Sequence, residues 1–424
     1  MKPVSRLTTL PGGLRIATCE MPHTQTAAMG IWASVGGRHE PAALNGISHF
    51  IEHMLFKGTR RRSARRIMED VEGVGGDINA FTSEERTCYY AASAAEHFPR
   101  VCDVLCDIYM EPRFSPRDID RERGVIAEEI QMYCDEPSSH VQELLQQTYW
   151  QGHPLGRPLT GTHSTIATMD AAAFRSYRAA HYTAPATVVT AAGNIRHAEV
   201  VDRVSGLLSG LPQKTPAPAA AYPRIPAKPR IAAEARDIQQ TQLSLALPAP
   251  GINAPLRHAF LVLNTILGAN ASSRLFQELR EKRGLCYSVS SNILSLRDGG
   301  LLEISAGLDR RNLEKSLRIV LAAIESLRKK PVAPRELRRA VEFLIGSGRM
   351  ALERTSTQSS RLGNSILAKG KIVDPETITA RIRATTPDDI LAAARAFLDP
   401  SRITLAVVGP NPDTPMLRKL LAAE

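Results

Sequence analysis

The chain has 424 residues, of which 43% are hydrophobic and 23% charged, and its formal net charge is +10. This composition is typical of a globular protein of about two domains, and it excludes disordered, collagen-like and low-complexity proteins. No apolar run approaches the ~18 residues that a membrane-spanning helix needs. Residues 1–20 also lack the apolar centre of a signal peptide. We therefore expect no membrane span and a cytoplasmic protein.

Basic residues are spread along the chain rather than gathered in one patch. The densest run, KGTRRRSARR at residues 57–66, contains no aromatic side chain on which a nucleotide base could stack. We interpret this run as a solvated loop followed by the start of a helix, and we expect no nucleic-acid partner.

The six cysteines form no Cys-x-x-Cys pair, which indicates a reducing compartment. Cys102 and Cys106 are one helical turn apart and could in principle bind a metal. Because only two soft ligands are present there, we interpret them as part of a packed helix face.

The hydrophobic pattern of the first half predicts two strands and three helices. In chain order they are a strand at 27–35, a helix at 45–58, a strand at 87–94, and helices at 95–110 and 114–130. Asn45 is the expected N-cap of the helix at 45–58, and Gly58 is its expected stop.

A proline-rich stretch follows at residues 212–229, where 6 of 18 residues are proline. Such a stretch cannot continue a helix or a central strand, so it predicts an extended linker. The predicted organisation is therefore a first half at 1–211, a linker at 212–229 and a second half at 230–424.

The second half repeats the order of the first. Its predicted strands lie at 240–248 and 300–308, and its helices at 312–327 and 332–348. The segment at 332–348 is the counterpart of 114–130, displaced by 218 residues. We infer an internal duplication and an α+β fold with two homologous halves, each a mainly antiparallel sheet packed with helices.

Residues 45–59, NGISHFIEHMLFKGT, contain the motif His-x-x-Glu-His. His49 and His53 are four residues apart, so their imidazoles project from one helix face and can hold one metal ion. Glu52 lies on a neighbouring part of that face, where its carboxylate can take a proton from metal-bound water. On the order of 0.03 copies of such a motif arise by chance in this composition. The alternative is an ordinary histidine pair on an amphipathic helix.

A third ligand is expected in the helix at 114–130. Glu122 and Glu129 are seven residues apart, which is two turns along one helix face. The alternative is a solvated acidic face. The apolar residues Val125, Ile126 and Ile130 indicate that this helix is partly buried, and a buried carboxylate needs a partner.

With these motifs, the chain resembles the pitrilysin/insulinase family of zinc metallopeptidases, the inverted zincins. It is most similar to the branch that contains the β-subunit of mitochondrial processing peptidase and its bacterial relatives. The resemblance spans the whole chain and is carried by LNGISHFIEHMLFKGT, GGDINAFTS (75–83), ERGVIAEEI (122–130) and SSRLFQELREKRGLCYSV (272–289). It implies two halves that face each other as a clamshell, the first bearing zinc and the second, without metal, completing the active site.

The resemblance also implies roles for single residues of the first half. His49, His53 and Glu129 match the Zn²⁺ ligands, and Glu52 matches the base that activates the zinc water for attack on the scissile carbonyl. Glu122 matches a carboxylate that orients a ligating histidine.

The segment 75–83 matches the strand edge on which substrates of the family lie. Its expected substrate-binding residues are Asn79, Ala80 and Phe81. There a substrate adds to the sheet as an extra strand, so that main-chain hydrogen bonds supply affinity that tolerates many sequences. The alternative for this segment is simply a turn followed by a strand.

In the second half, Arg280 and Tyr287 match the arginine and tyrosine that the family brings to the zinc site. A cation and a phenol there would stabilise the developing oxyanion or hold the substrate backbone. Gly284 is expected to end a helix between them. Without the resemblance, Arg280 would be a solvated helix residue and Tyr287 a core residue.

Some positions depart from the family pattern. The 218-residue offset places Leu267 opposite His49 and Ser347 opposite Glu129, so no metal site is expected in the second half. Ser139 and Glu143 stand where the processing-peptidase β-subunit presents acidic groups to substrate arginine, which puts that preference in doubt.

The sequence therefore predicts a zinc endopeptidase that acts on short or unfolded polypeptides. We expect a homodimer, with pairing to another subunit as the open alternative. Two other readings belong to different classes, namely a non-catalytic partner subunit and a basic nucleic-acid binder. Zinc bound per chain separates the endopeptidase from the non-catalytic subunit. Salt-dependent binding to DNA or RNA would support the nucleic-acid binder.

Overall fold

In the computed structural model, which describes residues 3–422, a six-stranded sheet forms the centre of a first compact unit. This unit comprises the chain up to residue 131, residues 157–220 and residues 349–373. The strand order is β1-β2-β6-β3-β5-β4, and every neighbouring pair is antiparallel except β2 and β6. The strands are β1 (Val4–Thr9), β2 (Arg15–Glu20), β3 (Thr26–Ala33), β4 (Asp77–Thr82), β5 (Thr87–Ala94) and β6 (Thr187–Gly193).

Side chains alternate between the two faces of this sheet, as the two-residue period of a strand requires. One face carries Ile16, Met29, Ile31 and Tyr89 into a large apolar core that the helices cover. The helices on this face are α1 (Ile47–Leu55), α2 (Ala64–Glu72), α3 (Phe98–Met110), α6 (His163–Ala167), α7 (Ala171–His181) and α8 (His197–Leu207), together with most of α4 (Pro116–Asp135).

The opposite face of the first sheet is covered by α12 (Thr355–Lys369), a helix from the end of the chain. Leu362 and Ile366 of this helix are fully buried against Trp32 and its neighbours. Gly363 lies so close to the indole of Trp32 that no β-carbon fits between them. A segment far away in the sequence thus completes the core of the first unit.

A five-stranded sheet forms the centre of the second unit, which comprises residues 132–156, 221–348 and the chain from residue 374. Its order is β7-β11-β8-β10-β9, and only β7 and β11 are parallel. The strands are β7 (Arg230–Ala235), β8 (Thr241–Pro248), β9 (Cys286–Ser295), β10 (Gly300–Leu308) and β11 (Thr404–Gly409).

The second sheet is also covered on both faces. One face packs on a core of apolar helix side chains, and the other packs on α5 through Val141, Leu145 and Tyr149. The helices of this unit are α5 (Pro137–Tyr149), α9 (Arg257–Leu267), α10 (Leu313–Lys329), α13 (Pro375–Arg383), α14 (Pro387–Phe397) and α15 (Thr414–Ala422), together with most of α11 (Pro334–Leu352).

The two helices α5 and α12 are equivalent under the predicted duplication. An offset of 218 residues moves α5 from residues 137–149 to residues 355–367, which lie within α12. Each helix packs on the sheet built from the other half of the sequence. The predicted α+β fold with two homologous, mainly antiparallel halves is confirmed, whereas the division at residues 211 and 230 stays a prediction along the sequence.

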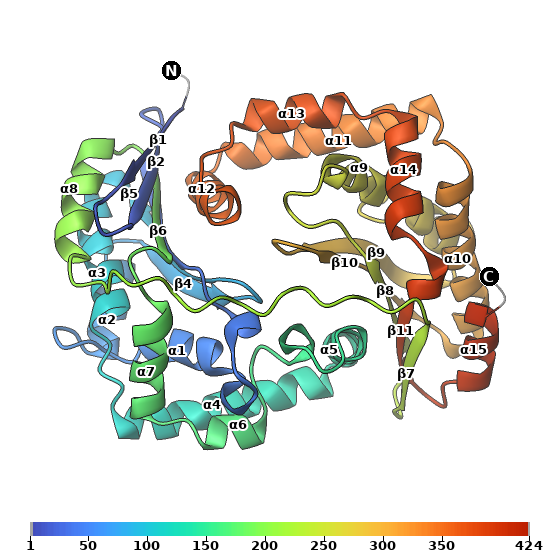
Figure 1. Cartoon of the computed structure of the whole chain (residues 1–424), viewed down its shortest axis with the longest axis horizontal. Coiled ribbons are helices and arrows are strands. Elements are labelled where there is room, and N and C mark those ends of the chain that lie inside the picture. The colour runs from blue at the N-terminus through green and yellow to red at the C-terminus, as the bar shows by residue number, and fades with distance from the viewer. Residues whose placement is uncertain (1–2, 423–424) are drawn as a thin grey trace. The chain divides into compact units, whose positions relative to one another are not determined.

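The local predictions can be compared element by element. The expected segments correspond to β3, α1, β5, α3 and α4, and then to β8, β10, α10 and α11 (Figure 1). Residues 208–229 contain neither a helix nor a strand, as the proline-rich composition predicts. Every helix among residues 3–422 is too short or too polar to cross a membrane.

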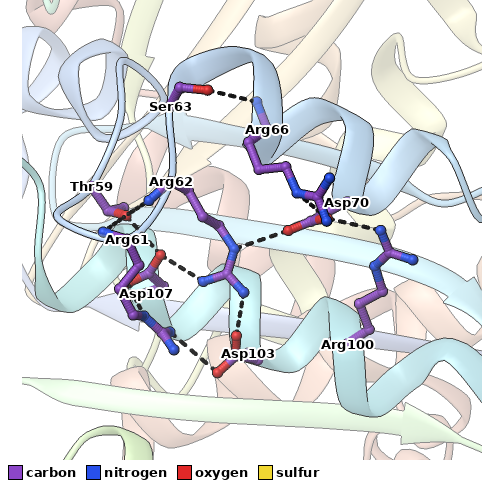
Figure 2. A network of polar contacts seen from close by, with 9 residues as sticks. All are labelled: Thr59, Arg61, Arg62, Ser63, Arg66, Asp70, Arg100, Asp103 and Asp107. Carbon is purple, nitrogen blue, oxygen red and sulfur yellow. Dashed lines mark hydrogen bonds and ion pairs between the residues drawn. The ribbon is translucent and has the colours of Figure 1, made fainter.

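The interpretation of the basic run as solvated is wrong for Arg62, whereas the side chains of the other arginines of the run are more than half exposed. Arg62 donates to Asp70, Asp103 and Asp107, and only 14% of its side chain is exposed. Arg61 pairs with Asp103 and Asp107, and Arg66 and Arg100 pair with Asp70 (Figure 2). Three aspartates of α2 and α3 therefore bind the arginines in one network, because the loop after α1 runs directly over these helices.

Candidate active site

The helix α1, which carries His-x-x-Glu-His, begins at a buried carboxylate. Glu40 is 3% exposed and accepts hydrogen bonds from the backbone N–H groups of Gly46 and Ser48, at 2.7 and 2.9 Å. Free N–H groups at a helix start favour a negative charge. Burial raises the pKa of Glu40, and these hydrogen bonds oppose the rise.

The predicted N-cap of α1, Asn45, is therefore wrong. The N-cap position is Gly46, whose φ of 94° lies in the left-handed region that favours glycine. The side-chain amide of Asn45 instead donates to Glu40 and to the carbonyl of Pro158, which holds the loop before the helix. The helix ends at Leu55, and Gly58 lies in the loop beyond it.

The two histidines of the motif converge on Glu129 of α4. The Nε2 atoms of His49 and His53 each lie 3.6 Å from Glu129 Oε2, and their rings are 4.5 Å apart between centroids. One donor atom from each of the three residues lies within 4.8 Å of the other two. Among residues 3–422, this is the only such group of three or more histidines, cysteines or carboxylates.

These residues fit a zinc ion. Two imidazole nitrogens and one carboxylate oxygen are donors that zinc prefers, and three protein ligands leave a fourth position for water. Burial, followed by the neighbouring His53, lowers the pKa of His49 to about 3. The imidazole is therefore neutral near pH 7, which is the form that binds a metal.

Glu122 lies behind His53, on the side away from Glu129. Its Oε1 is 2.8 Å from His53 Nδ1, and its Oε2 is 2.7 Å from Lys57 Nζ. Burial of Glu122 opposes its charge, but its contacts with His53 and Lys57 keep the pKa of its carboxyl below the usual value. A carboxylate that accepts from Nδ1 leaves the Nε2 lone pair of the same ring free for a metal.

Glu52 is held by a strand rather than by its own helix. The hydroxyl of Thr82, at the end of β4, donates to Glu52 Oε2 at 2.5 Å. Burial raises the pKa of Glu52, whereas the Thr82 hydrogen bond and His53 lower it and Glu129 raises it further. The Glu52 carboxylate, next to the candidate ligand His53 in the sequence, is thus fixed in direction by a hydroxyl.

The segment predicted to bind substrate forms β4, an edge strand paired only with β5. Asn79 is exposed, Ala80 is partly buried and Phe81 is 37% exposed. The N–H of Ala80 donates to the side-chain oxygen of its neighbour Asn79 at 2.8 Å. Phe81 packs edge-on against Trp32, with ring centroids 5.8 Å apart.

Arg280 and Tyr287 lie together in the second unit. Arg280 belongs to a π-helical turn (Phe276–Glu281), and Tyr287 is the second residue of β9. The Arg280 guanidinium lies 5.4 Å from the centre of the Tyr287 ring. Tyr287 is 75% exposed, so the core position that its residue type alone would suggest is excluded. Gly284, with a φ of 58°, stands between the helical turn and the strand.

Three residues that contact α1 or the candidate metal ligands were not singled out from the sequence, namely Glu40, Lys57 and Thr82. Lys57 carries a usable signal, because it follows His53 by four residues, the spacing at which side chains meet along a helix, even though α1 itself ends at Leu55. Thr82 and Glu40 carry none, because each reaches its partner across the fold.

The sequence comparisons decide the family. Residues 15–163 match the insulinase family (peptidase family M16), and residues 168–344 match the peptidase M16 inactive domain. The chain belongs to peptidase family M16. An uncharacterized zinc protease of Streptomyces coelicolor is 41% identical over 414 residues, covering 96% of this chain and 90% of that protein. The zinc protease YmxG of Bacillus subtilis is 33% identical, covering 96% of this chain and 98% of its own length.

Solved structures show the same fold. A protease from Helicobacter pylori has a TM-score of 0.91 at 19% identity, over 97% of this chain and all of that chain. A peptidase M16 inactive domain from Pseudomonas fluorescens has a TM-score of 0.90 at 20% identity, over 96% and 98% of the two chains. This M16 protein is a zinc metalloprotease, as the sequence predicts.

Proposed function

We propose that this M16 protein is an endopeptidase that hydrolyses short or unfolded polypeptides, with His49, His53 and Glu129 as its zinc ligands. The observation that carries the proposal is the convergence of two imidazole Nε2 atoms on one carboxylate, 3.6 Å from each. Glu52, one residue before His53 and held by Thr82, is the general base.

Zinc, when bound, supplies a Lewis acid that lowers the pKa of a coordinated water and polarises the scissile carbonyl. Glu52 accepts a proton from the attacking water at its carboxylate and then delivers it to the leaving nitrogen. The Thr82 hydroxyl orients that carboxylate, and Glu122 orients His53. Tyr287 and Arg280 stabilise the developing oxyanion or hold the substrate backbone.

Substrate selection follows from the edge strand β4. An extended chain that pairs with this edge replaces the hydrogen bond from the Ala80 N–H to Asn79 by one to its own backbone. Folded proteins present few unpaired strand edges, so they are poor substrates. We expect cleavage only within short or unfolded segments. A homodimer and a cytoplasmic location remain predictions of the sequence.

The test replaces Glu52 by Gln, which keeps the size and most hydrogen bonding of the side chain but removes the base. Turnover of a peptide library should fall by about 100-fold or more, while zinc per chain, measured by plasma mass spectrometry, stays near that of the wild type. Glu128→Gln is the matched control, because Glu128 is an exposed neighbour of Glu129 on α4. His49→Ala should lose both zinc and turnover.

The outcomes separate the proposal from its alternatives. Wild-type turnover in Glu52→Gln would show that Glu52 is not the base. Wild-type chain that binds zinc but cleaves no member of the library would favour the non-catalytic subunit. Digestion of a stable protein at the same rate as its unfolded form would overturn the proposed substrate class.

A further inference from the structure

Lys57, Glu122 and His53 form a chain of polar contacts that connects Lys57 to the candidate metal site. Its Nζ lies 2.7 Å from Glu122 Oε2, and the other oxygen of Glu122 lies 2.8 Å from His53 Nδ1. The Glu122 side chain is only 3% exposed, so its two oxygens are held by these side chains rather than by bulk water. One carboxylate therefore joins a cation on one side to a candidate zinc ligand on the other.

The backbone on both sides of Lys57 is fixed. The N–H of Lys57 donates to the carbonyl of Met54 in the last turn of α1. The N–H of Arg113 donates to the carbonyl of Gly58. The φ of Gly58 is 117°, and a β-carbon there would run into the guanidinium of Arg113. Lys57 thus leaves the metal helix at a turn that only glycine allows.

The loop beyond this turn is anchored by the ion network of Figure 2. The Thr59 hydroxyl donates to Asp107 at 2.8 Å, and the Thr59 oxygen accepts from the N–H groups of Arg61 and Arg62. Asp107, with 1% of its side chain exposed, also binds both guanidinium groups. These contacts fix the conformation of the loop and, with it, the backbone position of Lys57.

The two histidines differ in the hydrogen bonding of Nδ1, the ring nitrogen that does not face Glu129. His49 Nδ1 is buried and has no hydrogen-bond partner among residues 3–422, whereas His53 Nδ1 is bound by Glu122. The direction of the His53 ring thus depends on where the Glu122 carboxylate lies. Lys57 is the group that holds the second oxygen of that carboxylate.

We propose that Lys57 is a positioning residue of this M16 protease, which holds Glu122 against His53 so that His53 Nε2 is directed at the metal. The inference rests on the proposed function, because it takes His53 as a zinc ligand. It assigns to Lys57 an effect on metal affinity that a merely structural ion pair would not have. Without the ammonium, the buried Glu122 keeps one partner instead of two and can turn away from His53.

The experiment measures zinc affinity by competition with a chromogenic chelator, using the whole chain. Lys57→Met keeps the length and apolar stem of the side chain but removes its charge, and Lys57→Gln is a second variant in case the first folds poorly. We expect the dissociation constant of zinc to rise about 10- to 100-fold in both, the usual loss when the residues that support a metal-ligating histidine are disturbed. Lys57→Arg should restore affinity to within about threefold, since a guanidinium can reach the same oxygen.

The matched control is Arg274→Met. Arg274 also pairs with a partly buried carboxylate, Glu336 Oε2 at 2.7 Å, and both residues belong to the second unit, outside the network of Figure 2. Zinc affinity should be unchanged in this variant. Equal losses of zinc affinity in Arg274→Met and Lys57→Met would show a general effect on stability and overturn the inference.

A double-mutant cycle tests the route through Glu122. If Lys57 acts through this carboxylate, adding Lys57→Met to Glu122→Gln should cause no further loss of zinc affinity. Additive losses, or wild-type affinity in Lys57→Met and Lys57→Gln, would overturn the inference. His49→Ala identifies a failure of the proposed function instead, because unchanged zinc binding in that variant would mean that the metal is held elsewhere.

Discussion

Thr82 Oγ1 donates a hydrogen bond of 2.5 Å to Glu52 Oε2, and so connects the last residue of strand β4 to the metal helix α1. Glu52 could adopt several rotamers in a half-buried setting, and this bond selects one of them. Because β4 is also the proposed substrate strand, Thr82 connects the proposed general base directly to the proposed substrate-binding backbone.

Thr82→Val should therefore lower kcat with little change in KM. The variant keeps the shape of threonine but cannot donate, and a misdirected general base costs about 10- to 100-fold in turnover. Steady-state kinetics on a single peptide, together with zinc per chain, checks this, and zinc should not change. Thr82→Ser should recover most of kcat. Ser83→Ala is the control, because the Ser83 hydroxyl donates to the Arg86 carbonyl instead; unaltered kcat in Thr82→Val would contradict the assigned role.

Much of this site could be predicted from the sequence, because its core is local. His49, Glu52 and His53 lie on one nine-residue helix, where spacing alone decides which side chains share a face. Glu129 was found through the same periodicity on α4 and through the family motif. Thr82 and Glu40 were missed, because a hydrogen bond across the fold leaves no mark in the local pattern.

It could not be predicted, for a related reason, that α5 and α12 each pack on the sheet built from the other half of the sequence. Amphipathic periodicity indicates that a helix has an apolar face, but not which sheet that face covers. Leu145 and Leu362 would be assigned to the core of their own half of the sequence, yet each packs on the other sheet. The wrong N-cap at Asn45 is similar, since Glu40 reaches the free N–H groups of α1 from an earlier loop.

Tyr287→Phe should lower turnover by about 10- to 1000-fold, the range for losing one oxyanion donor. Folding and zinc content should be unaffected, because the side chain is 75% exposed and contacts no candidate ligand within its own unit. Peptide kinetics and thermal unfolding of the two proteins check this. Ser288→Ala, a change at the next exposed residue of β9, is the control. Wild-type kcat in Tyr287→Phe would remove Tyr287 from the proposed mechanism.

The ion network of Figure 2 predicts a pH dependence of stability. Burial opposes the charge of Asp70, but hydrogen bonds from Arg100 and Arg62 hold its pKa below the usual value. A carboxyl whose pKa is lower in the folded chain stabilises the fold above its unfolded pKa of ~3.9, and this contribution is lost as the pH falls through the folded value.

Asp70→Asn should accordingly destabilise the protein by about 1–3 kcal/mol at pH 7, and by less as the pH falls below ~4. Urea unfolding of both proteins across this pH range measures the difference. Glu69→Gln, which removes an exposed carboxylate paired only with Arg65 among the described residues, should have little effect at any pH. A destabilisation by Asp70→Asn that does not vary with pH would contradict the charged role of Asp70.

The packing of α12 on the first sheet predicts opposite effects for two helical glycines. A β-carbon at Gly363 would overlap the ring of Trp32, whereas a β-carbon at Gly348 of α11 meets no atom within 4 Å. Gly363→Ala should therefore destabilise the protein by about 1–3 kcal/mol through overpacking. Gly348→Ala should be neutral or stabilise it by up to ~1 kcal/mol, since alanine favours a helix over glycine. Thermal unfolding of the two variants beside the wild type measures both.

Because Trp32 belongs to the sheet of the first unit, the loss of stability in Gly363→Ala should be accompanied by a change in tryptophan fluorescence. Equal unfolding temperatures for the two variants would show that residues 355–369 do not pack on this sheet in solution.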